Sequence, residues 1–309
     1  MSSQHESLVS RRGLLAQGAA VAVLAGATAR AEQRSRQGGG GAARGFGFRT
    51  QVGVQLYSVR DDCAKDLPGT IAKVAQMGYQ GVEFAGYYGR SAAELRQMLD
   101  DNGIVCCGTH TGLDTLLGDN LQKTIDFNKT LGNRYLIVPG LPGQYTNSID
   151  AWTKTGKLFA ELAEKTKAQD MRVGYHNHSA EFQKMDGKLP WEVFLDNSGQ
   201  DVIMQLDIGN AIHGGQGVDP IPYIYRYPGR TVTIHLKEFS KTNDKAVVGE
   251  GDVPWRAVFA LCRAVGNTDW YIVEQESYAT TPLESIQKCL ENLREMRLIF
   301  TPGGQRQSG

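Results

Sequence analysis

Eight short apolar runs recur between residues 50 and 300 of this chain, and longer segments with helical periodicity separate them. This alternation is typical of βαβ units, in which helices cover a parallel sheet. The predicted strands are Val52–Tyr57, Gly81–Phe84, Val105–His110, Tyr135–Pro139, Arg172–Asn177, Ile203–Ile208, Thr231–Lys237 and Tyr271–Gln275. Eight such units in about 250 residues predict a single-domain α/β protein with the (β/α)8, or TIM barrel, fold.

Predicted helices occupy the segments between the strands. They include Leu67–Met77, Ala92–Asp101, Leu121–Thr130, Ala151–Gln169 and Trp255–Ala264, with Leu283–Phe300 closing the series. The rival arrangement is a doubly wound open sheet, which usually has about five or six strands and a glycine-rich fingerprint after the first. The sequence has neither feature, so we interpret it as a closed barrel.

The first 31 residues have the organisation of an export signal. Paired Arg11 and Arg12 precede an apolar run from Leu14 to Ala29, and the sequence Ala29-Arg30-Ala31, with small residues at 29 and 31, offers a cleavage site. The arginine pair resembles a twin-arginine signal, with a Sec signal or an N-terminal anchor as the alternative. We therefore expect an exported protein, in the periplasm for example, that uses the twin-arginine export machinery.

Two further segments flank the predicted barrel. Residues 32–49 include Gly38–Gly41 and are too glycine-rich to pack, so they predict a flexible linker. The barrel should span residues 50–300, and residues 301–309 should form a disordered tail.

The charge balance of the chain favours a small neutral substrate. Lys plus Arg and Asp plus Glu each total 33, so no net field draws the chain to nucleic acid or to an anionic membrane. The five cysteines contain no CxxC pair, and we expect them to be core residues and not a disulfide framework. The sequence leaves the oligomeric state open, a homo-oligomer included.

Side chains that bind metals end each of the last four predicted strands, namely His176, Asp207, His235 and Glu274. In a TIM barrel these strand ends meet at the catalytic face. One such residue alone is as often a cap or a structural residue, but four together are costly to bury without a cation. Two imidazoles and two carboxylates suit one divalent Mn, Co, Fe or Zn ion, whereas Mg and Ca prefer oxygen ligands.

Acid–base candidates lie beside these ligands. Besides Glu274 they are His178, Glu181 and Lys237. Lys237 follows His235 by two residues, so both side chains should face the same side of the strand, where a lysine could stabilise an enolate oxygen. The alternative is an ordinary rim pair between Lys237 and Glu238 or Glu276.

Four side chains are candidates for contact with a substrate. They are His110 at the end of the third predicted strand, Glu83 near the end of the second, Glu276 after the eighth, and Trp255. The Trp255 ring could stack on a sugar, with core packing as the alternative. For His110 and Glu83 a capping role is the alternative. His213 is expected in a loop.

At these strand ends the sequence resembles the xylose isomerase-like TIM barrels of AP endonuclease 2 type, the superfamily of sugar phosphate isomerases/epimerases. The matching motifs are LDIGN at Asp207, IHLKE at His235, VEQE at Glu274 and VGEGDVPW at residues 248–255. The resemblance covers about residues 50–300. It implies metal ligands on strands five to eight, and an isomerase or epimerase that removes a proton beside the metal-bound carbonyl of a keto-sugar or sugar derivative.

Strand five departs from the pattern of the epimerases. They have Glu-Asn-His there, whereas this chain has His176, Asn177 and His178. With His176 as a neutral imidazole ligand, only Glu274 remains of the two glutamates that those epimerases use on opposite sides of one carbon. The Tyr-His-Asn-His version resembles the inosose dehydratases and the enzymes of 3-keto-glycosides, in which a metal-stabilised enolate expels a leaving group. An isomerase/epimerase and a dehydratase or lyase therefore both stay open.

Two other functions fit the sequence less well. The DNA-repair endonucleases of the same superfamily need a cluster of metals, more histidines and a basic face, whereas this chain has six histidines and no net charge. A non-catalytic sugar-binding barrel would have lost part of the ligand set, which is complete here. Because no dense Lys/Arg or glycine-rich phosphate cradle is visible, we expect an unphosphorylated sugar.

Overall fold

The computed structural model describes residues 50–215 and 219–299, and the predicted signal, linker and tail lie outside this range. Eight parallel strands close into a barrel, in which each strand pairs with its sequence neighbours and the last pairs with the first. The strands are β1 (Gln51–Gln55), β2 (Gly81–Ala85), β3 (Val105–His110), β4 (Tyr135–Val138), β5 (Arg172–His176), β6 (Ile203–Asp207), β7 (Thr233–Leu236) and β8 (Trp270–Val273). All eight predicted strands and the TIM barrel fold are confirmed.

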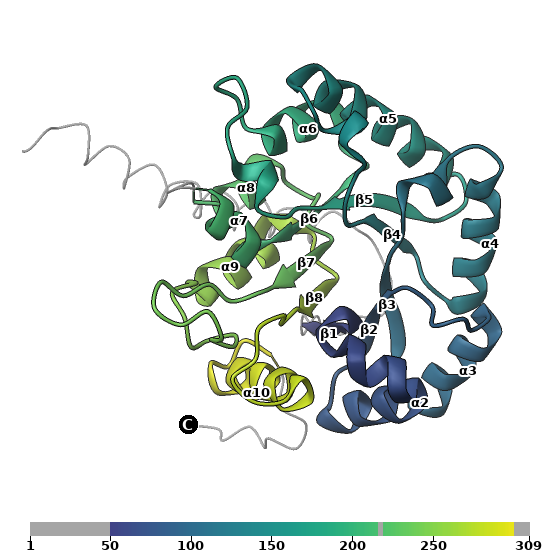
Figure 1. Cartoon of the computed structure of the whole chain (residues 1–309), viewed down its shortest axis with the longest axis vertical. Helices are drawn as coiled ribbons and strands as arrows, with labels where there is room; N and C mark the ends of the chain where they lie inside the picture. The colour runs from purple at the N-terminus through teal and green to yellow at the C-terminus, as the bar shows by residue number, and fades with distance from the viewer. Residues whose placement is uncertain (1–49, 216–218, 300–309) are drawn as a thin grey trace, which may run out of the picture. The chain divides into compact units, whose positions relative to one another are not determined.

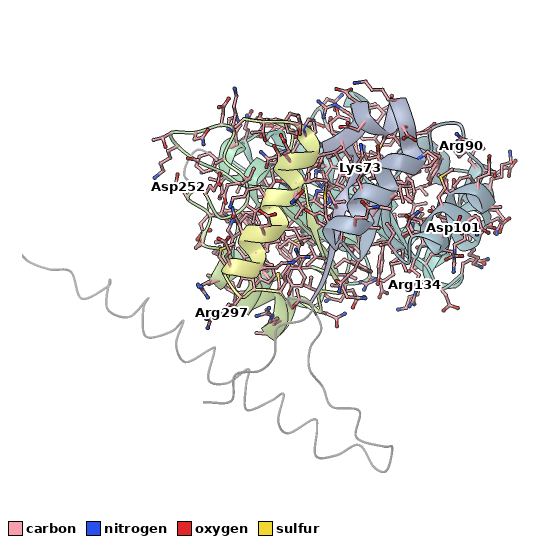
Figure 2. The ribbon with its side chains drawn as sticks, turned by 90° about the horizontal axis from the view of Figure 1, so that it is seen from below. Lys73, Arg90, Asp101, Arg134, Asp252 and Arg297 are labelled. Atoms are coloured by element: carbon pink, nitrogen blue, oxygen red, sulfur yellow. The ribbon has the colours of Figure 1, made fainter. Side chains whose placement is uncertain are left out.

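The helices lie outside the strands and surround the barrel (Figure 1). They are α2 (Arg60–Met77), α3 (Ala92–Asp101), α4 (Asn120–Leu131), α5 (Ile149–Lys167), α6 (Pro190–Ser198), α7 (Ile208–Gly214), α8 (Pro222–Arg226), α9 (Trp255–Leu261) and α10 (Pro282–Glu295). Charged side chains of both signs, such as Lys73, Arg90 and Asp101, project from the outer surface (Figure 2). Among the described residues, no helix combines the length and apolar character that crossing a membrane requires.

Local sequence signals explain where several helices begin and end. Ser91 and Glu94 form a capping box at the start of α3, and Thr281 and Glu284 form one at the start of α10. Each box satisfies backbone N–H groups that have no partner within the helix. Gly78 ends α2 in the left-handed conformation (φ 100°) that glycine adopts without steric cost.

The helices differ from the prediction mainly at their ends. α2 begins at Arg60 rather than Leu67, and it bends at Asp66, whose backbone is not helical (φ −154°, ψ 83°). Asp66 Oδ1 accepts a hydrogen bond from Gly69 N (3.0 Å), so it caps a second helical segment that begins at the predicted residue. The expectation that His213 lies in a loop is wrong, because the residue belongs to the last turn of α7.

The N-terminal end of the barrel interior is apolar and tightly filled. Its buried side chains are Cys107, Tyr135, Ile137, Ile203, Val232, Trp270 and Ile272. Glycines make room for them: a Cβ atom at Gly81 would lie 2.9 Å from the Trp270 ring, and one at Gly174 would lie 2.6 Å from Ile203 Cβ. The barrel is therefore a packed core at this end and not a channel.

Two residues further along the strands, the interior becomes polar. Gln55 lies two residues after Gly53, and Gln205 lies two residues after Ile203. Side chains two residues apart on a strand face the same side. The polar layer contains Gln55, Glu83, Gln205 and Thr233, all of them fully buried. This layer lies between the apolar core and the C-terminal strand ends, so it supports whatever those ends hold.

The expectation that the cysteines are core residues is confirmed. All five are buried and free of disulfides in the part of the chain that the structure describes. Cys106 and Cys107 are consecutive in β3 and therefore point to opposite faces of the sheet.

Adding one methyl group at a glycine of the barrel interior tests how tightly the interior is packed. Gly174→Ala should lower the free energy of unfolding by about 1–3 kcal/mol, because the added Cβ would lie 2.6 Å from Ile203 Cβ and 2.8 Å from the Ile203 carbonyl oxygen. Gly140→Ala is the control, since a Cβ there meets no described atom within 4 Å. Urea unfolding curves measure the difference, and equal curves for the two variants would contradict this account.

Candidate metal centre

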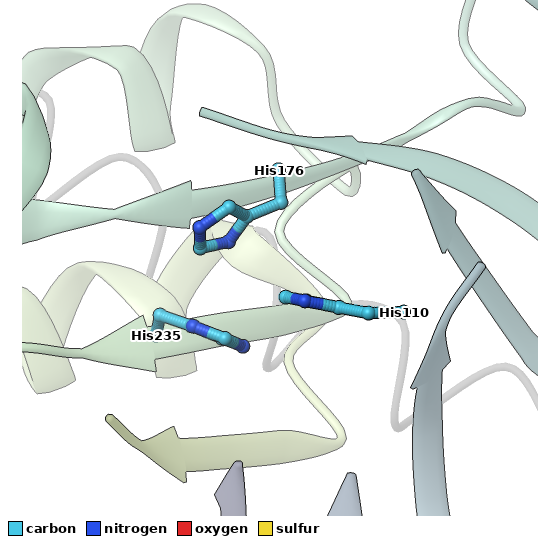
Figure 3. Close-up of side chains that lie close together, drawn as sticks. All are labelled: His110, His176 and His235. Atoms are coloured by element: carbon cyan, nitrogen blue, oxygen red, sulfur yellow. The ribbon is translucent and has the colours of Figure 1, made fainter. Parts of the chain in front are cut away.

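Four side chains with metal-binding chemistry converge at the C-terminal end of the barrel. His176 ends β5, Asp207 ends β6, His235 lies within β7, and Glu274 directly follows β8. One ligand atom from each residue lies within 4.8 Å of those of the other three, and all four residues are buried. The rings of His176 and His235, together with that of His110 from β3, point toward one another across the barrel (Figure 3). The structure thus brings the four sequence-predicted ligands together.

The charges of the cluster fit a cation. Among the described residues, Asp207 Oδ2 is buried without a hydrogen-bond partner, while Asp207 Oδ1 accepts from Asn210 N (2.7 Å). Burial raises the pKa of Asp207 to about 8, although Lys237 opposes the shift. A carboxylate oxygen that is buried and unpaired is costly, and a divalent ion would compensate it. The donor set of two imidazoles and two carboxylates suits Mn, Co, Fe or Zn.

His235 carries the strongest interactions of the cluster. Its Nε2 donates to Glu83 Oε2 (2.6 Å), and its Nδ1 lies 3.1 Å from Glu274 Oε2. Burial lowers the pKa of His235, but the carboxylates of Glu83 and Glu274 outweigh burial and raise it to about 10. Without a bound cation the ring therefore holds a proton on the side that faces Glu274, and a metal ion would take the place of that proton.

Lys237 joins the same cluster from the rim. Its Nζ pairs with Glu276 and lies 3.9 Å from Glu274 Oε2, so it contacts both the rim and the ligand set. Burial lowers the pKa of Lys237, but Asp207, Glu274 and Glu276 outweigh burial and hold it above its ordinary value. The side chain is a stable ammonium group beside the site. Of the two rim pairs expected, the one with Glu276 forms.

A family model for the xylose isomerase-like TIM barrel matches residues 71–296. The chain belongs to this family. An inosose dehydratase of Serratia proteamaculans is 24% identical, over 73% of this chain and 88% of that protein. A sugar phosphate isomerase/epimerase from Parabacteroides distasonis is similar in structure, with a TM-score of 0.70 and 24% identity over 84% of this chain and 98% of that one.

A further solved structure of the same fold is that of the IOLI protein, which contains a bound zinc atom. It has a TM-score of 0.61 and 13% identity, and the match covers 82% of this chain and 100% of that one. At these identities the structural likenesses concern the fold. The family barrel thus provides the strand ends, and the residues of this chain determine what they hold.

The loop after β5 holds the other two acid–base candidates. His178 is exposed, and its ring lies 5.0 Å from that of His176, centroid to centroid. Glu181 is buried, and its two oxygens accept hydrogen bonds from Tyr175 Oη (2.6 Å) and His178 N (2.8 Å). Glu181 therefore fastens this loop to the barrel, and the acid–base role expected of it stays a prediction.

Two of the expected substrate contacts are wrong. Glu83 does not line a cavity, because it is fully buried and its carboxylate contacts His235, His110, Gln55 and Gln205. Trp255 offers no stacking face, since it is only 2% exposed. His110 lies at the end of β3 as expected, with its Nε2 2.9 Å from Gln205 Oε1.

Glu238 holds the loop that buries Trp255. Its carboxylate accepts hydrogen bonds from Gly249 N (2.7 Å), Val253 N (3.2 Å) and Trp255 Nε1 (2.7 Å). The VGEGDVPW segment thus folds around one carboxylate at the end of β7. The alternative pair between Lys237 and Glu238 is consequently wrong, because Glu238 faces its own loop.

Two supporting residues were missed by the sequence analysis. Gln205 lies two residues before Asp207 on the same face of β6, and it contacts both His110 and His176. Asn177 exchanges two hydrogen bonds with the backbone of Asp207, at 2.8 Å and 3.1 Å. Because side chains two residues apart on a strand face the same side, the position of Asp207 could have indicated that Gln205 also faces the barrel interior. Asn177 follows a ligand and gave no comparable signal.

The metal site predicts the outcome of removing a ligand. The wild-type chain should bind about one divalent ion, and Asp207→Ala or His235→Ala should abolish binding because each removes one of four ligands. Dialysis against Mn²⁺, Co²⁺ or Zn²⁺ followed by elemental analysis measures the content. His213→Ala is the control, because that histidine is exposed on α7 and should leave the content unchanged. Full metal content in both ligand variants would disprove the site.

Proposed function

We propose that the protein is a divalent-metal-dependent enzyme that acts on an unphosphorylated keto-sugar or sugar derivative. The observation that carries the proposal is the convergence of two imidazoles and two carboxylates at the catalytic end of the barrel, with one buried carboxylate oxygen lacking a partner among the described residues. The similarity to an inosose dehydratase supports an inosose-like cyclic ketone, a sugar derivative, as the substrate class.

Elimination of water or of an aglycone fits this site better than epimerisation. An epimerase removes a proton from one side of a carbon and returns it from the other, which calls for two proton-transfer groups on opposite sides. Here an imidazole, that of His176, stands on β5 where the epimerases have a glutamate, so of their two facing glutamates only Glu274 is present. The loss of one of the two glutamates favours a dehydratase or lyase acting on an inosose-like or 3-keto-glycoside substrate.

The side chains of this chain have distinct tasks in such an elimination. A bound divalent ion would act as a Lewis acid on the substrate carbonyl and acidify the neighbouring C–H group. The Lys237 ammonium, held by Glu276, would stabilise negative charge on the substrate oxygen. His178 is the exposed group that accepts the proton; the C–H electron pair then forms the C=C bond. The next C–O bond breaks, and its oxygen leaves with the electron pair of that bond and with the proton that His178 accepted, so His178 ends the reaction in its starting state.

A sugar isomerase or epimerase is the second candidate. His178 follows β5, whereas Lys237 follows β7, so two proton-transfer groups come from different walls of the barrel. Exchange of a proton between them would support inversion at one carbon. The structural likeness to a sugar phosphate isomerase/epimerase agrees with either chemistry, because it concerns the fold.

One experiment separates the two reactions. The purified protein, loaded with Mn²⁺, Co²⁺ or Zn²⁺, is incubated with an inosose or a 3-keto-glycoside in deuterated water and followed by NMR. We expect an unsaturated product and release of water or aglycone. Deuterium exchange with inversion and no elimination would instead support the epimerase. The Asp207→Ala variant is the control for metal dependence, and turnover of no keto-sugar by the metal-loaded protein would refute both candidates.

The role of Lys237 gives a separate prediction. Lys237→Met should lower kcat by about 10²–10³-fold, as loss of one oxyanion-stabilising donor does, while the metal content stays at the wild-type level. Lys241→Met is the control, because that lysine is exposed beyond the end of β7. Steady-state kinetics and elemental analysis are measured on the same samples. A variant with wild-type kcat would remove Lys237 from the proposed reaction.

A further inference from the structure

The amide of Gln55 shows which groups around Glu83 are donors. Tyr57 N, a backbone donor, gives its hydrogen bond to Gln55 Oε1 (3.0 Å). The other end of the amide, Nε2, consequently faces Glu83 Oε2 and donates to it (2.9 Å). His235 Nε2 (2.6 Å) and His110 Nε2 (3.2 Å) face the same carboxylate oxygen. An ionised carboxylate only accepts hydrogen bonds, so His235 carries a proton on Nε2, and Nδ1 is the nitrogen that can bind a metal once it gives up the proton that faces Glu274.

Gln205 connects Glu83 to His176, the second imidazole ligand, by hydrogen bonds from the two ends of its amide. Its Nε2 donates to Glu83 Oε1 (2.8 Å) and to Thr233 Oγ1 (3.0 Å), because a carboxylate oxygen cannot donate. Gln205 Oε1 therefore points the other way, to His176 Nδ1 at 3.1 Å. An amide oxygen accepts, so His176 carries its proton on Nδ1. The lone pair of His176 Nε2, which lies 3.9 Å from Glu274 Oε2, is left for the metal.

We propose that Glu83 sets the tautomers of both imidazole ligands: that of His235 by a direct hydrogen bond, and that of His176 through the amide of Gln205. Among the described residues, Glu83 and His176 share no hydrogen bond, so the second effect is relayed. Glu83 is then a positioning residue: the metal-binding tautomer of His176 exists before any ion arrives, and His235 keeps its Nε2 proton when an ion replaces the proton on Nδ1. The inference rests on the metal site of the proposed function and is independent of the reaction catalysed.

The charge states of these groups agree with the relay. Burial opposes ionisation of Glu83, but His110 and His235 outweigh burial and hold the pKa of Glu83 well below its usual range. Burial, with help from His235 and His110, holds the pKa of His176 well below its ordinary value. A neutral imidazole carries one ring proton, and the position of that proton decides whether His176 can bind a metal.

Glu83→Gln tests the relay because an amide has one accepting and one donating end. Three donors face the position of Glu83 Oε2, so the amide oxygen of the introduced glutamine should lie there. The NH₂ group of that glutamine should then face Gln205. The Gln205 amide must then turn over and present its own NH₂ to His176, which moves the proton from Nδ1 to Nε2. In the reverse orientation the NH₂ group faces His235 and displaces its Nε2 proton. Either way, one ligand presents N–H to the metal site.

The measurement uses the full chain labelled with ¹⁵N-histidine. Long-range ¹H–¹⁵N spectra of the metal-free protein should show His176 protonated at Nδ1 in the wild type and at Nε2 in E83Q. Calorimetry with Zn²⁺ should show an affinity about 10–100-fold lower for E83Q. Thr233→Val is the matched control: it removes a hydroxyl partner of Gln205 and leaves Glu83 in place, so His176 should keep its Nδ1 proton.

A charge-swapped variant makes the test specific. In E83Q/Q205E the carboxylate moves to position 205, where it accepts from the new amide on one side and from His176 Nδ1 on the other. This variant should restore both the Nδ1 proton of His176 and the wild-type affinity for Zn²⁺. If E83Q fails to fold, the His176 tautomer and the Zn²⁺ affinity of E83Q/Q205E alone test the proposal. Folded E83Q in which His176 keeps its Nδ1 proton and His235 also keeps its Nε2 proton, or an Nε2 proton on His176 in E83Q/Q205E, would overturn the proposal.

The outcome is separable from that of the proposed function. Absence of turnover on every keto-sugar would refute the reaction and leave the histidine spectra and Zn²⁺ affinities as a valid test of the relay. Conversely, a wild-type chain that turns over substrate while E83Q leaves both the Nδ1 proton of His176 and the Nε2 proton of His235 in place would refute the relay alone.

Discussion

The buried carboxylate of Glu83 is the group on which the polar interior of this barrel depends. A charge removed from water is tolerated only when donors surround it, and two glutamines and two histidines provide them from β1, β3, β6 and β7. Each donor is thereby fixed in orientation, and the far end of each side chain is fixed with it. The two imidazoles of the candidate metal site are oriented by this group, His235 directly and His176 through Gln205.

The barrel interior has an apolar layer that fills space and a polar layer that holds the candidate metal ligands. The apolar layer around Trp270 and Ile203 fills the N-terminal end, where glycines leave space for the larger rings. Because the strands are held rigidly by that core, side chains two residues further along project at fixed positions. The loop after β5 adds support at Asp207, because Asn177 bonds to the Asp207 backbone, whereas the loop after β7 folds around Glu238.

The sequence predicted the parts of this structure that depend on periodicity. The alternation of apolar runs and helices was sufficient for the barrel, and one polar residue at each of four strand ends was sufficient for the ligand set. The contacts of Glu83 were not predictable, because they join strands whose register depends on the whole closed sheet. Trp255 was misjudged for a similar reason. Its exposure depends on how a long loop folds around Glu238, and no local pattern encodes that.

The order in which the ligands occur along the chain has a consequence for how the protein is made. Glu274 follows the last strand, and β8 must pair with β1 before the sheet closes. A nascent chain emerging from the ribosome therefore carries Glu83, His176, Asp207 and His235 long before the site is complete. Incomplete chains would offer an ion at most three of the four candidate ligands, so tight metal binding would require the closed barrel.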